Sequence, residues 1–323
     1  MKFGIYPGGR AGTVCSHPPD TAAIGSLVDE LSGGHPFVIR EYVHFFGDSA
    51  SPDVIASLGA EDELEHLTMP DDWYAAGRRE LDLVVSYLPQ TADMPGWLAF
   101  LDAVIDRYGH LTRYLQVTLE PNFPIPFIDG SSPGVREALT QGIPHARATL
   151  NRRGLEDVRV GFSVAEPPEW LGGDGDFWQH LGGLPDFAAH VDYVGLALYP
   201  DAFSPVPPEA VAPMTTHALH HLREQSLPAA GIPATTPIHI AENGTPHDSL
   251  SAMLGAIVAD RESLNITHYE LFSLRDADSA SSEPTGSLGL VTDTYRRKPA
   301  FETYRNFVDS MCRPGAVPFD AGV

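Results

Sequence analysis

The sequence contains little lysine, little cysteine and no long apolar run. Its lysines are Lys2 and Lys298, so a reaction that needs a lysine Schiff base, such as that of a lysine-dependent aldolase, is nearly excluded. Its cysteines are Cys15 and Cys312, which form a disulfide only if the fold brings the two ends of the chain together. Because residues 1–9 carry no secretory signal, we expect free thiols in the reducing environment of the cytoplasm.

Basic residues are also scarce. The 323 residues include 20 Lys and Arg against 43 Asp and Glu, which gives a formal net charge of −23, and the basic residues form no cluster. This charge argues against nucleic acid and against an anionic membrane surface as partners. No apolar stretch approaches the roughly 20 residues that span a bilayer, so we expect no membrane-spanning segment. The sequence leaves the oligomeric state open.

Motifs for cofactors and metals are lacking as well. The glycines of residues 8–12 do not have the spacing of a dinucleotide-binding turn. No Gly-x-Ser-x-Gly nucleophile turn is present. His217, His220 and His221 have the spacing of one helix face, which we interpret as a solvated face rather than a zinc site. We therefore expect no cofactor and no bound metal.

What the sequence does contain is a regular alternation of short apolar runs and longer helical stretches. The apolar runs are residues 3–6, 37–46, 81–88, 114–120, 158–166, 191–199, 237–242 and 268–275. The helical stretches are residues 20–31, 51–59 with 71–80, 95–108, 133–152, 176–190, 207–226, 248–263 and 298–310. This order predicts an α/β fold of the (β/α)8 TIM-barrel class. We expect residues 1–323 to form a single domain, with the barrel core over 3–310 and a short C-terminal extension over 311–323.

Alternation along a strand indicates which side chains fill the barrel. In the sixth run the small or aromatic residues share one face and the large aliphatic residues share the other, namely Gly195, Ala197 and Tyr199 against Val194, Leu196 and Leu198. We expect the first set inside the barrel and the second set against the helices. The same reasoning predicts that His239 faces the helices if Glu242 faces the mouth of the barrel.

Three of the predicted strands end in glutamate: Glu120 ends the fourth, Glu166 the fifth and Glu242 the seventh. The C-terminal ends of barrel strands meet at one mouth, where catalytic groups lie. Carboxyl groups that repel and desolvate one another differ in protonation, as acid/base and nucleophilic chemistry requires. A single glutamate at a strand end can simply cap the following helix, so the functional interpretation depends on Glu120 and Glu242 together.

Several short motifs then resemble one enzyme superfamily. Besides Glu120, they are Glu242-Asn243-Gly244, Arg40 in the second strand, Tyr199-Pro200 after the sixth, and the tail over 269–301. In order and strand placement they resemble the retaining glycoside hydrolases of clan A, over roughly residues 3–310. The resemblance implies that Glu120 is the acid/base and Glu242 the nucleophile, steadied by Arg40 and Tyr199. It also implies carboxyl groups about 5–5.5 Å apart and a covalent glycosyl-enzyme intermediate.

Two positions depart from the pattern of that superfamily. Its acid/base glutamate usually follows an asparagine that contacts the sugar 2-hydroxyl, and here this position is Leu119. Its last strand usually carries a tryptophan beneath the sugar, and the matching residue here is Phe272. We expect hydrolysis of an oligosaccharide or a small glycoside. The alternative is a catalytically impaired or non-hydrolytic barrel that binds carbohydrate.

Further side chains are expected to contact the carbohydrate because they follow or end predicted strands: His44, Asn122, Glu166, Trp170, Asn243 and Arg275. A metal-assisted hydrolase or isomerase that uses Glu120, Glu166 and a histidine is a third interpretation. It ranks lowest because no ligand spacing supports it.

Overall fold

Eight parallel strands close into one barrel in the order β1 to β8, and the prediction of a (β/α)8 barrel is confirmed. The computed structural model describes residues 1–8, 15–47, 52, 67–126, 128–166, 175–204, 206–245 and 248–312. The strands are β1 (Lys2–Ile5), β2 (Phe37–Phe45), β3 (Arg79–Tyr87), β4 (Thr112–Val117), β5 (Arg159–Ala165), β6 (Tyr193–Leu198), β7 (Ile238–Asn243) and β8 (Ile266–Leu271). Pairing of β1 with both β2 and β8 completes the closure.

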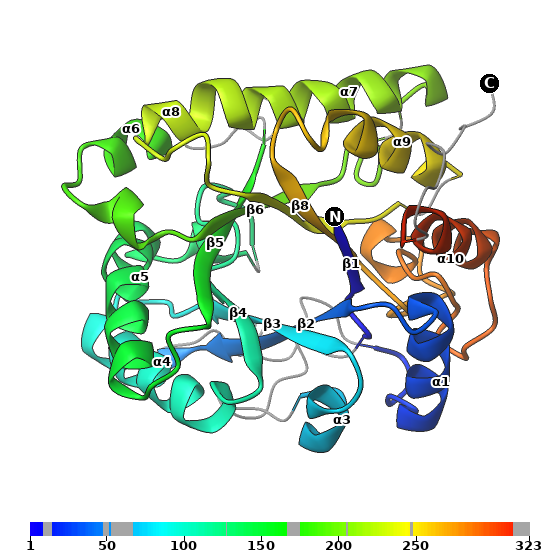
Figure 1. Ribbon diagram of the computed structural model, residues 1–323, viewed down its shortest axis with the longest axis horizontal. Coiled ribbons are helices and arrows are strands. Elements are labelled where there is room, and N and C mark those ends of the chain that lie inside the picture. Colours follow the sequence, from blue (N-terminus) through cyan, green and yellow to red (C-terminus); the bar gives the residue numbers. More distant parts are fainter. Residues whose placement is uncertain are drawn as a thin grey trace.

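Helices surround the barrel on all sides (Figure 1). They are α1 (Thr21–Ser32), α3 (Asp71–Ala75), α4 (Met94–Tyr108), α5 (Val135–Arg152), α6 (Phe177–Gly182), α7 (Pro208–His221), α8 (Leu227–Ala229), α9 (Leu250–Asp260) and α10 (Pro299–Cys312). The predicted helix over 51–59 lies outside the described residues. The predicted helix over 176–190 is in fact two pieces, α6 and the 3-10 turn Phe187–His190.

Local sequence explains where the longer helices begin and end. Asp20 caps α1, because its carboxylate accepts hydrogen bonds from two backbone N–H groups of the first turn. Gly33 ends the same helix in the left-handed conformation, with φ of 55°, which glycine adopts without strain. Asp93 caps α4, and Pro95 occupies its first turn, where a missing N–H costs nothing.

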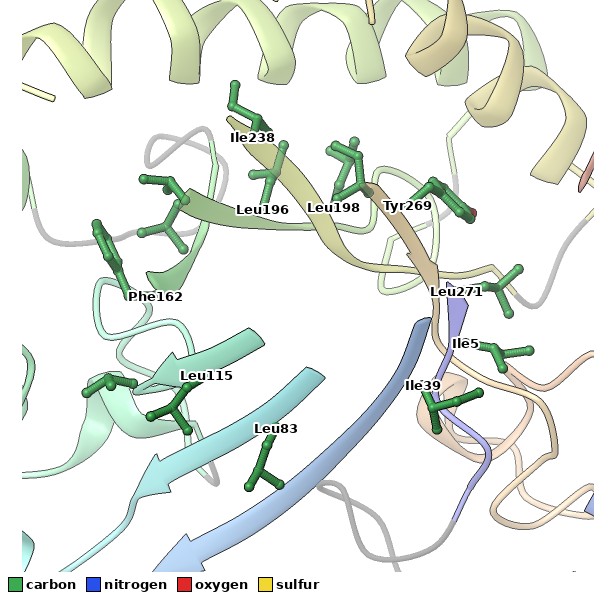
Figure 2. Packing of buried hydrophobic residues seen from close by; sticks show 14 of the residues in the cluster. Ile5, Ile39, Leu83, Leu115, Phe162, Leu196, Leu198, Ile238, Tyr269 and Leu271 are labelled. Atoms are coloured by element: carbon green, nitrogen blue, oxygen red, sulfur yellow. The ribbon is translucent and has the colours of Figure 1, made fainter. Parts of the chain in front are cut away.

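The main hydrophobic core lies between the barrel and the helices. Figure 2 shows side chains such as Ile39, Phe162 and Leu196 projecting from the strands toward the helical layer. Val194, Leu196 and Leu198 all belong to this core, which confirms the predicted alternation of the sixth strand. Inside the barrel the space is narrow at Gly195, where an added Cβ would lie 2.9 Å from the Cβ of Ala241.

Strand β7 contains an irregularity that reverses one prediction. Leu196 of β6 pairs with Ile240, but the next residue, Ala197, pairs with Glu242, so Ala241 is an extra residue in the strand. The extra residue shifts the alternation, and His239 and Glu242 both face the interior of the barrel. The ring of His239 stacks on Tyr193 with 4.1 Å between centroids. The prediction that His239 faces the helices is therefore wrong.

Two smaller expectations concern the membrane and the thiols. Within the described part of the chain, no helix has both the length and the apolar character needed to cross a bilayer. Cys15 and Cys312 are not joined in a disulfide. The extension expected over 311–323 begins inside α10, which continues to Cys312, and its residues beyond 312 lie outside the described residues.

Candidate active site

A cavity of about 500 Å³ opens at the C-terminal ends of the strands. Glu242 reaches it from inside β7, Glu120 from the segment after β4, and Tyr199 from the residue after β6. Most of the remaining lining is apolar and comes from the end of β6 and from the loops after β4, β6 and β8: Leu119, Phe123, Ile125, Ile128, Ala197, Leu198, Pro200, Phe203, Phe272 and Leu288. The structure thus brings all three predicted strand-end glutamates, Glu120, Glu166 and Glu242, to the wall of one largely apolar cavity.

Three side chains hold the Glu242 carboxylate by hydrogen bonds. The Tyr42 hydroxyl donates to Oε1 over 2.6 Å, and the Arg40 guanidinium donates to the same oxygen over 3.3 Å. The Tyr199 hydroxyl donates to Oε2 over 3.1 Å. Glu242 is only 6% exposed, so these bonds replace water at a buried charge. Oε2 accepts one of these hydrogen bonds, whereas Oε1 accepts two.

Arg40 is the centre of a buried polar network. Besides Glu242, its N–H groups reach Asp82 over 2.6 Å, Gln116 over 2.9 Å and the hydroxyl of Tyr42 over 2.7 Å. Burial alone would lower the pKa of Arg40, but the neighbouring tyrosine and carboxyl groups hold this pKa well above its ordinary value. Arg40 therefore stays charged and fixes the Glu242 carboxylate in position.

Glu120 has a different environment from Glu242. Burial raises the pKa of Glu120 well above its ordinary value, and the charge of Glu242 raises it further. The backbone of Glu120 is left-handed, with φ of 46°, and so is that of Thr118, with φ of 68°. Such conformations are costly for residues other than glycine and are typical of functional sites. The geometry thus provides one neutral acid and one carboxylate held by donors in the same cavity.

Leu119 and Phe272, the two departures from the clan A pattern, lie together in the cavity wall. They belong to a small apolar cluster that includes Tyr6 and Tyr42. The ring of Phe272 stacks on Tyr6 with 5.1 Å between centroids, and a cis peptide bond joins Phe272 to Ser273. Leu119 donates its backbone N–H to Asp129 over 2.8 Å, while its side chain offers no polar group to a ligand.

Glu166 also borders the cavity, but its carboxylate is turned toward the helices. Oε1 accepts from the indole of Trp178 over 2.6 Å and from Ser226 over 3.0 Å, and Oε2 lies 2.8 Å from His221 Nδ1. Burial raises the pKa of Glu166, whereas these partners oppose the shift. The contact also corrects the interpretation of His221 as part of a solvated face, because this side chain is only 15% exposed.

Asn122 and Asn243 are engaged by the protein itself. The amide of Asn122 exchanges two hydrogen bonds with the backbone of Ala165. That of Asn243 donates to the carbonyl of Leu198 and accepts from the hydroxyl of Tyr269. Both asparagines therefore tie neighbouring strands together and do not line the cavity.

Arg275 and His44 also lie away from the cavity. Arg275 donates to the carbonyls of His17 and Pro18 and so anchors the segment that precedes α1. His44 is buried on β2, where its ring lies 5.9 Å from that of Phe46. Trp170 lies outside the described residues.

Sequence reasoning missed three hydrogen-bond partners of Arg40: Tyr42, Asp82 and Gln116. One of them could have been found, because Tyr42 is two residues from Arg40 on the same strand and so shares its face. The other two come from two different strands and carry no motif. Nowhere in the described part of the chain do three His, Cys, Asp or Glu side chains gather as a metal site would require.

Comparisons with known proteins address the fold. No family model and no curated protein sequence matches this chain. Among solved structures, the chain is similar to a GH1 β-glucosidase from Exiguobacterium antarcticum B7, with a TM-score of 0.62 and 13% identity over 97% of this chain and 98% of the other. It is similar to a β-glucosidase from Thermotoga maritima in complex with deoxynojirimycin, with a TM-score of 0.63 and 12% identity over 95% and 97%.

A third similar structure is a family 39 glycoside hydrolase from Bacteroides cellulosilyticus WH2, with a TM-score of 0.58 and 13% identity. That match covers 96% of this chain and 64% of the other. The chain therefore has the barrel fold of GH1 and GH39 glycosidases, as the resemblance to clan A implies.

Proposed function

We propose that this protein is a retaining glycoside hydrolase. The observation that carries the proposal is the unequal pair of carboxyl groups in one cavity. Arg40, Tyr42 and Tyr199 hold Glu242 by hydrogen bonds, while burial and the charge of Glu242 keep the neighbouring Glu120 protonated. A retaining glycosidase needs such a nucleophile beside such an acid.

In the first step Glu120 gives its proton to the glycosidic oxygen, and Glu242 Oε2 attacks the anomeric carbon. The bond from this carbon to the leaving oxygen breaks as the bond to Glu242 forms, and the aglycone departs as a neutral alcohol. Glu120 is now a carboxylate and removes a proton from water, whose oxygen attacks the same carbon. Glu242 leaves as a carboxylate, and its donors Tyr42 and Arg40 stabilise the returning charge.

The cavity favours a small glycoside over an oligosaccharide as substrate. The leaving group must lie beside Glu120, and the chain just after Glu120 supplies Phe123, Ile125 and Ile128 to the wall. Ile125 and Phe203 are 39% and 57% exposed, which makes both of them exposed large apolar side chains at the cavity. Such a wall suits an aromatic or aliphatic aglycone better than a second, hydroxyl-rich sugar.

Covalent labelling tests the proposal. The protein is incubated with a panel of 2-fluoroglycosides and cyclophellitol-type epoxides, and the adduct is mapped by mass spectrometry. We expect one sugar adduct on Glu242, lost in Glu242→Gln and kept in Glu166→Gln. Glu166→Gln is the matched control because Glu166 borders the same cavity with its carboxylate turned away.

The second candidate function is carbohydrate binding without hydrolysis, and the specific observation that favours it is Leu119. Its side chain places an apolar group beside the catalytic pair, where clan A enzymes usually have an amide. No adduct and no release of aglycone across the panel, together with saturable sugar binding by calorimetry, would support this second function against the first.

A further inference from the structure

Arg40 has a second carboxylate partner that the proposed reaction does not use. Asp82, on β3, accepts from the guanidinium over 2.6 Å, whereas Glu242 accepts over 3.3 Å. Both Arg40 and Asp82 are 1% exposed. The closer ion pair of Arg40 is thus with Asp82. Glu242 and Gln116 both accept from the other terminal nitrogen of the guanidinium, Nη2.

Next to Asp82 lies Glu270, on β8, which is 0% exposed. No N–H or O–H group of the described residues donates to either oxygen of Glu270. The carboxyl group of Asp82 is its immediate neighbour and interacts with it directly. Two adjacent carboxyl groups away from solvent can form a hydrogen bond only when one of them carries a proton.

The surroundings decide which carboxyl group holds the proton. Burial raises the pKa of Asp82 as well, but the guanidinium of Arg40 at 2.6 Å and the hydroxyl of Tyr193 at 3.4 Å oppose that shift and favour its ionised form. Glu270 has no such donor. Burial raises the pKa of Glu270 well above its ordinary value, and the negative charge of Asp82 raises it further.

Other charged or titratable groups that act on Glu270 come from four elements. They are Arg40 on β2, Glu242 on β7, Tyr193 on β6 and Tyr304 on α10. Arg40 is the one cation among them, and it is already matched against Glu242 and Asp82. An ionised Glu270 would place a third carboxylate around one buried guanidinium, which is costly.

We propose that Glu270 is a positioning residue: as a neutral acid it donates a proton in a hydrogen bond to Asp82, which keeps Asp82 as the close counter-ion of Arg40 and holds Arg40 where it reaches Glu242. This inference deepens the proposed glycosidase function and rests on it. The arrangement divides the charge of Arg40 between two carboxylates, so Glu242 is steadied without being locked into a tight ion pair.

A pair of variants at Glu270 tests the role. Glu270→Gln keeps an N–H donor for Asp82, and Glu270→Leu removes the donor with little change in volume. We expect Glu270→Gln to retain kcat within about threefold, and Glu270→Leu to lose roughly 10- to 100-fold in kcat with KM little changed. Equal activity of the leucine variant and the original protein would overturn the proposal.

Asp82→Asn separates positioning from mere structural support. It removes the charge that competes with Glu242 for Arg40, so the acid limb of the kcat/KM profile is expected to move to lower pH by about one unit. A purely structural role would lower activity at every pH and leave the limb in place. This variant also remains informative if Glu270→Leu fails to fold.

Infrared spectroscopy tests the proton on Glu270 without any turnover. At pH 7 we expect a C=O stretching band from the protonated carboxyl group of Glu270, and Glu270→Gln should abolish this band. Glu120→Gln should leave that band in place and abolish a second, separate band from Glu120. An unchanged spectrum for Glu270→Gln would overturn the inference. If the labelling and hydrolysis assays fail but the band behaves as expected, the glycosidase function is refuted while the shared proton of Asp82 and Glu270 stands.

Discussion

Replacing Tyr42 by phenylalanine removes the shortest of the three hydrogen bonds to Glu242. The hydroxyl lies 2.6 Å from Oε1, and both side chains are buried, so this is a charge-assisted hydrogen bond out of contact with water. A hydrogen bond to a charged group contributes about 1.5–3 kcal/mol, which corresponds to roughly 10- to 150-fold in rate. The ring itself remains, so packing against Phe272 at 6.4 Å is preserved.

The loss is expected to fall mainly on the second step of the reaction. In the proposed reaction Glu242 becomes neutral when it forms the glycosyl ester and regains its charge when the ester is hydrolysed, so its donors would stabilise the departing carboxylate. Tyr42→Phe should therefore slow kcat by the factor above and accumulate the glycosyl-enzyme. Stopped-flow measurements with an aryl glycoside should show a burst of phenol equal to the enzyme concentration.

Tyr199→Phe is the matched comparison, because its hydroxyl donates to the other oxygen over the longer distance of 3.1 Å. We expect a smaller decrease in kcat, roughly three- to tenfold. The reasoning is refuted if Tyr42→Phe folds normally and changes kcat by less than Tyr199→Phe does, since the shorter bond would then contribute less.

Four further predictions concern single side chains. Phe203→Ser should raise KM for an aryl glycoside by roughly tenfold and leave that for a methyl glycoside unchanged, as initial rates would show. Leu119→Asn should lower the free energy of unfolding by about 1–3 kcal/mol in urea titrations, because it introduces an amide into an apolar cluster. Glu166→Ala should cost a similar amount, since it leaves the buried partners of the carboxylate unsatisfied, yet labelling at Glu242 should persist. Burial raises the pKa of Glu41 to about 8, so the folded state binds the proton of this carboxyl group more tightly than the unfolded state does. The stability that this group contributes should therefore fall as pH rises from about 4.5 to about 8. Glu41→Gln should flatten that part of the curve of melting temperature against pH, as thermal unfolding would show.

The barrel could be predicted from sequence because its signals are local and repeated. Each parallel strand is buried on both faces and reads as a short apolar run, and each is followed by a break and a helix. The fourth strand shows where this signal ends. The apolar run continues to Glu120, but the ladder ends at Val117, because Thr118 adopts a left-handed conformation that turns the chain out of the sheet.

The orientation of side chains at strand ends was harder to predict, because one extra residue reverses it. Strict alternation places Glu242 and His239 on opposite faces only if the strand is regular. Ala241 is the extra residue, and an alanine gives no signal in the sequence that the strand is irregular there. Glu166 shows a different difficulty. In the sequence it ends a predicted strand just as Glu242 does, but the indole of Trp178 and the ring of His221 supply donors on the helix side, and the carboxylate turns to them.

The contact of Arg40 with Glu242 follows from the resemblance to clan A, but Asp82 and Gln116 could not be predicted as partners of Arg40 because they are far apart in sequence and each is unremarkable alone. Arg40, Asp82, Gln116 and Glu242 come from four strands, and their contacts exist only once the barrel closes. The number of buried charges, however, limits which carboxyl groups of this barrel can be ionised. With one buried guanidinium facing several carboxyl groups, some of these groups must hold protons, and geometry selects those that lack donors. Under the proposals made here Glu120 and Glu270 hold these protons, and of the two only Glu120 lines the cavity, where its proton could pass to a leaving group.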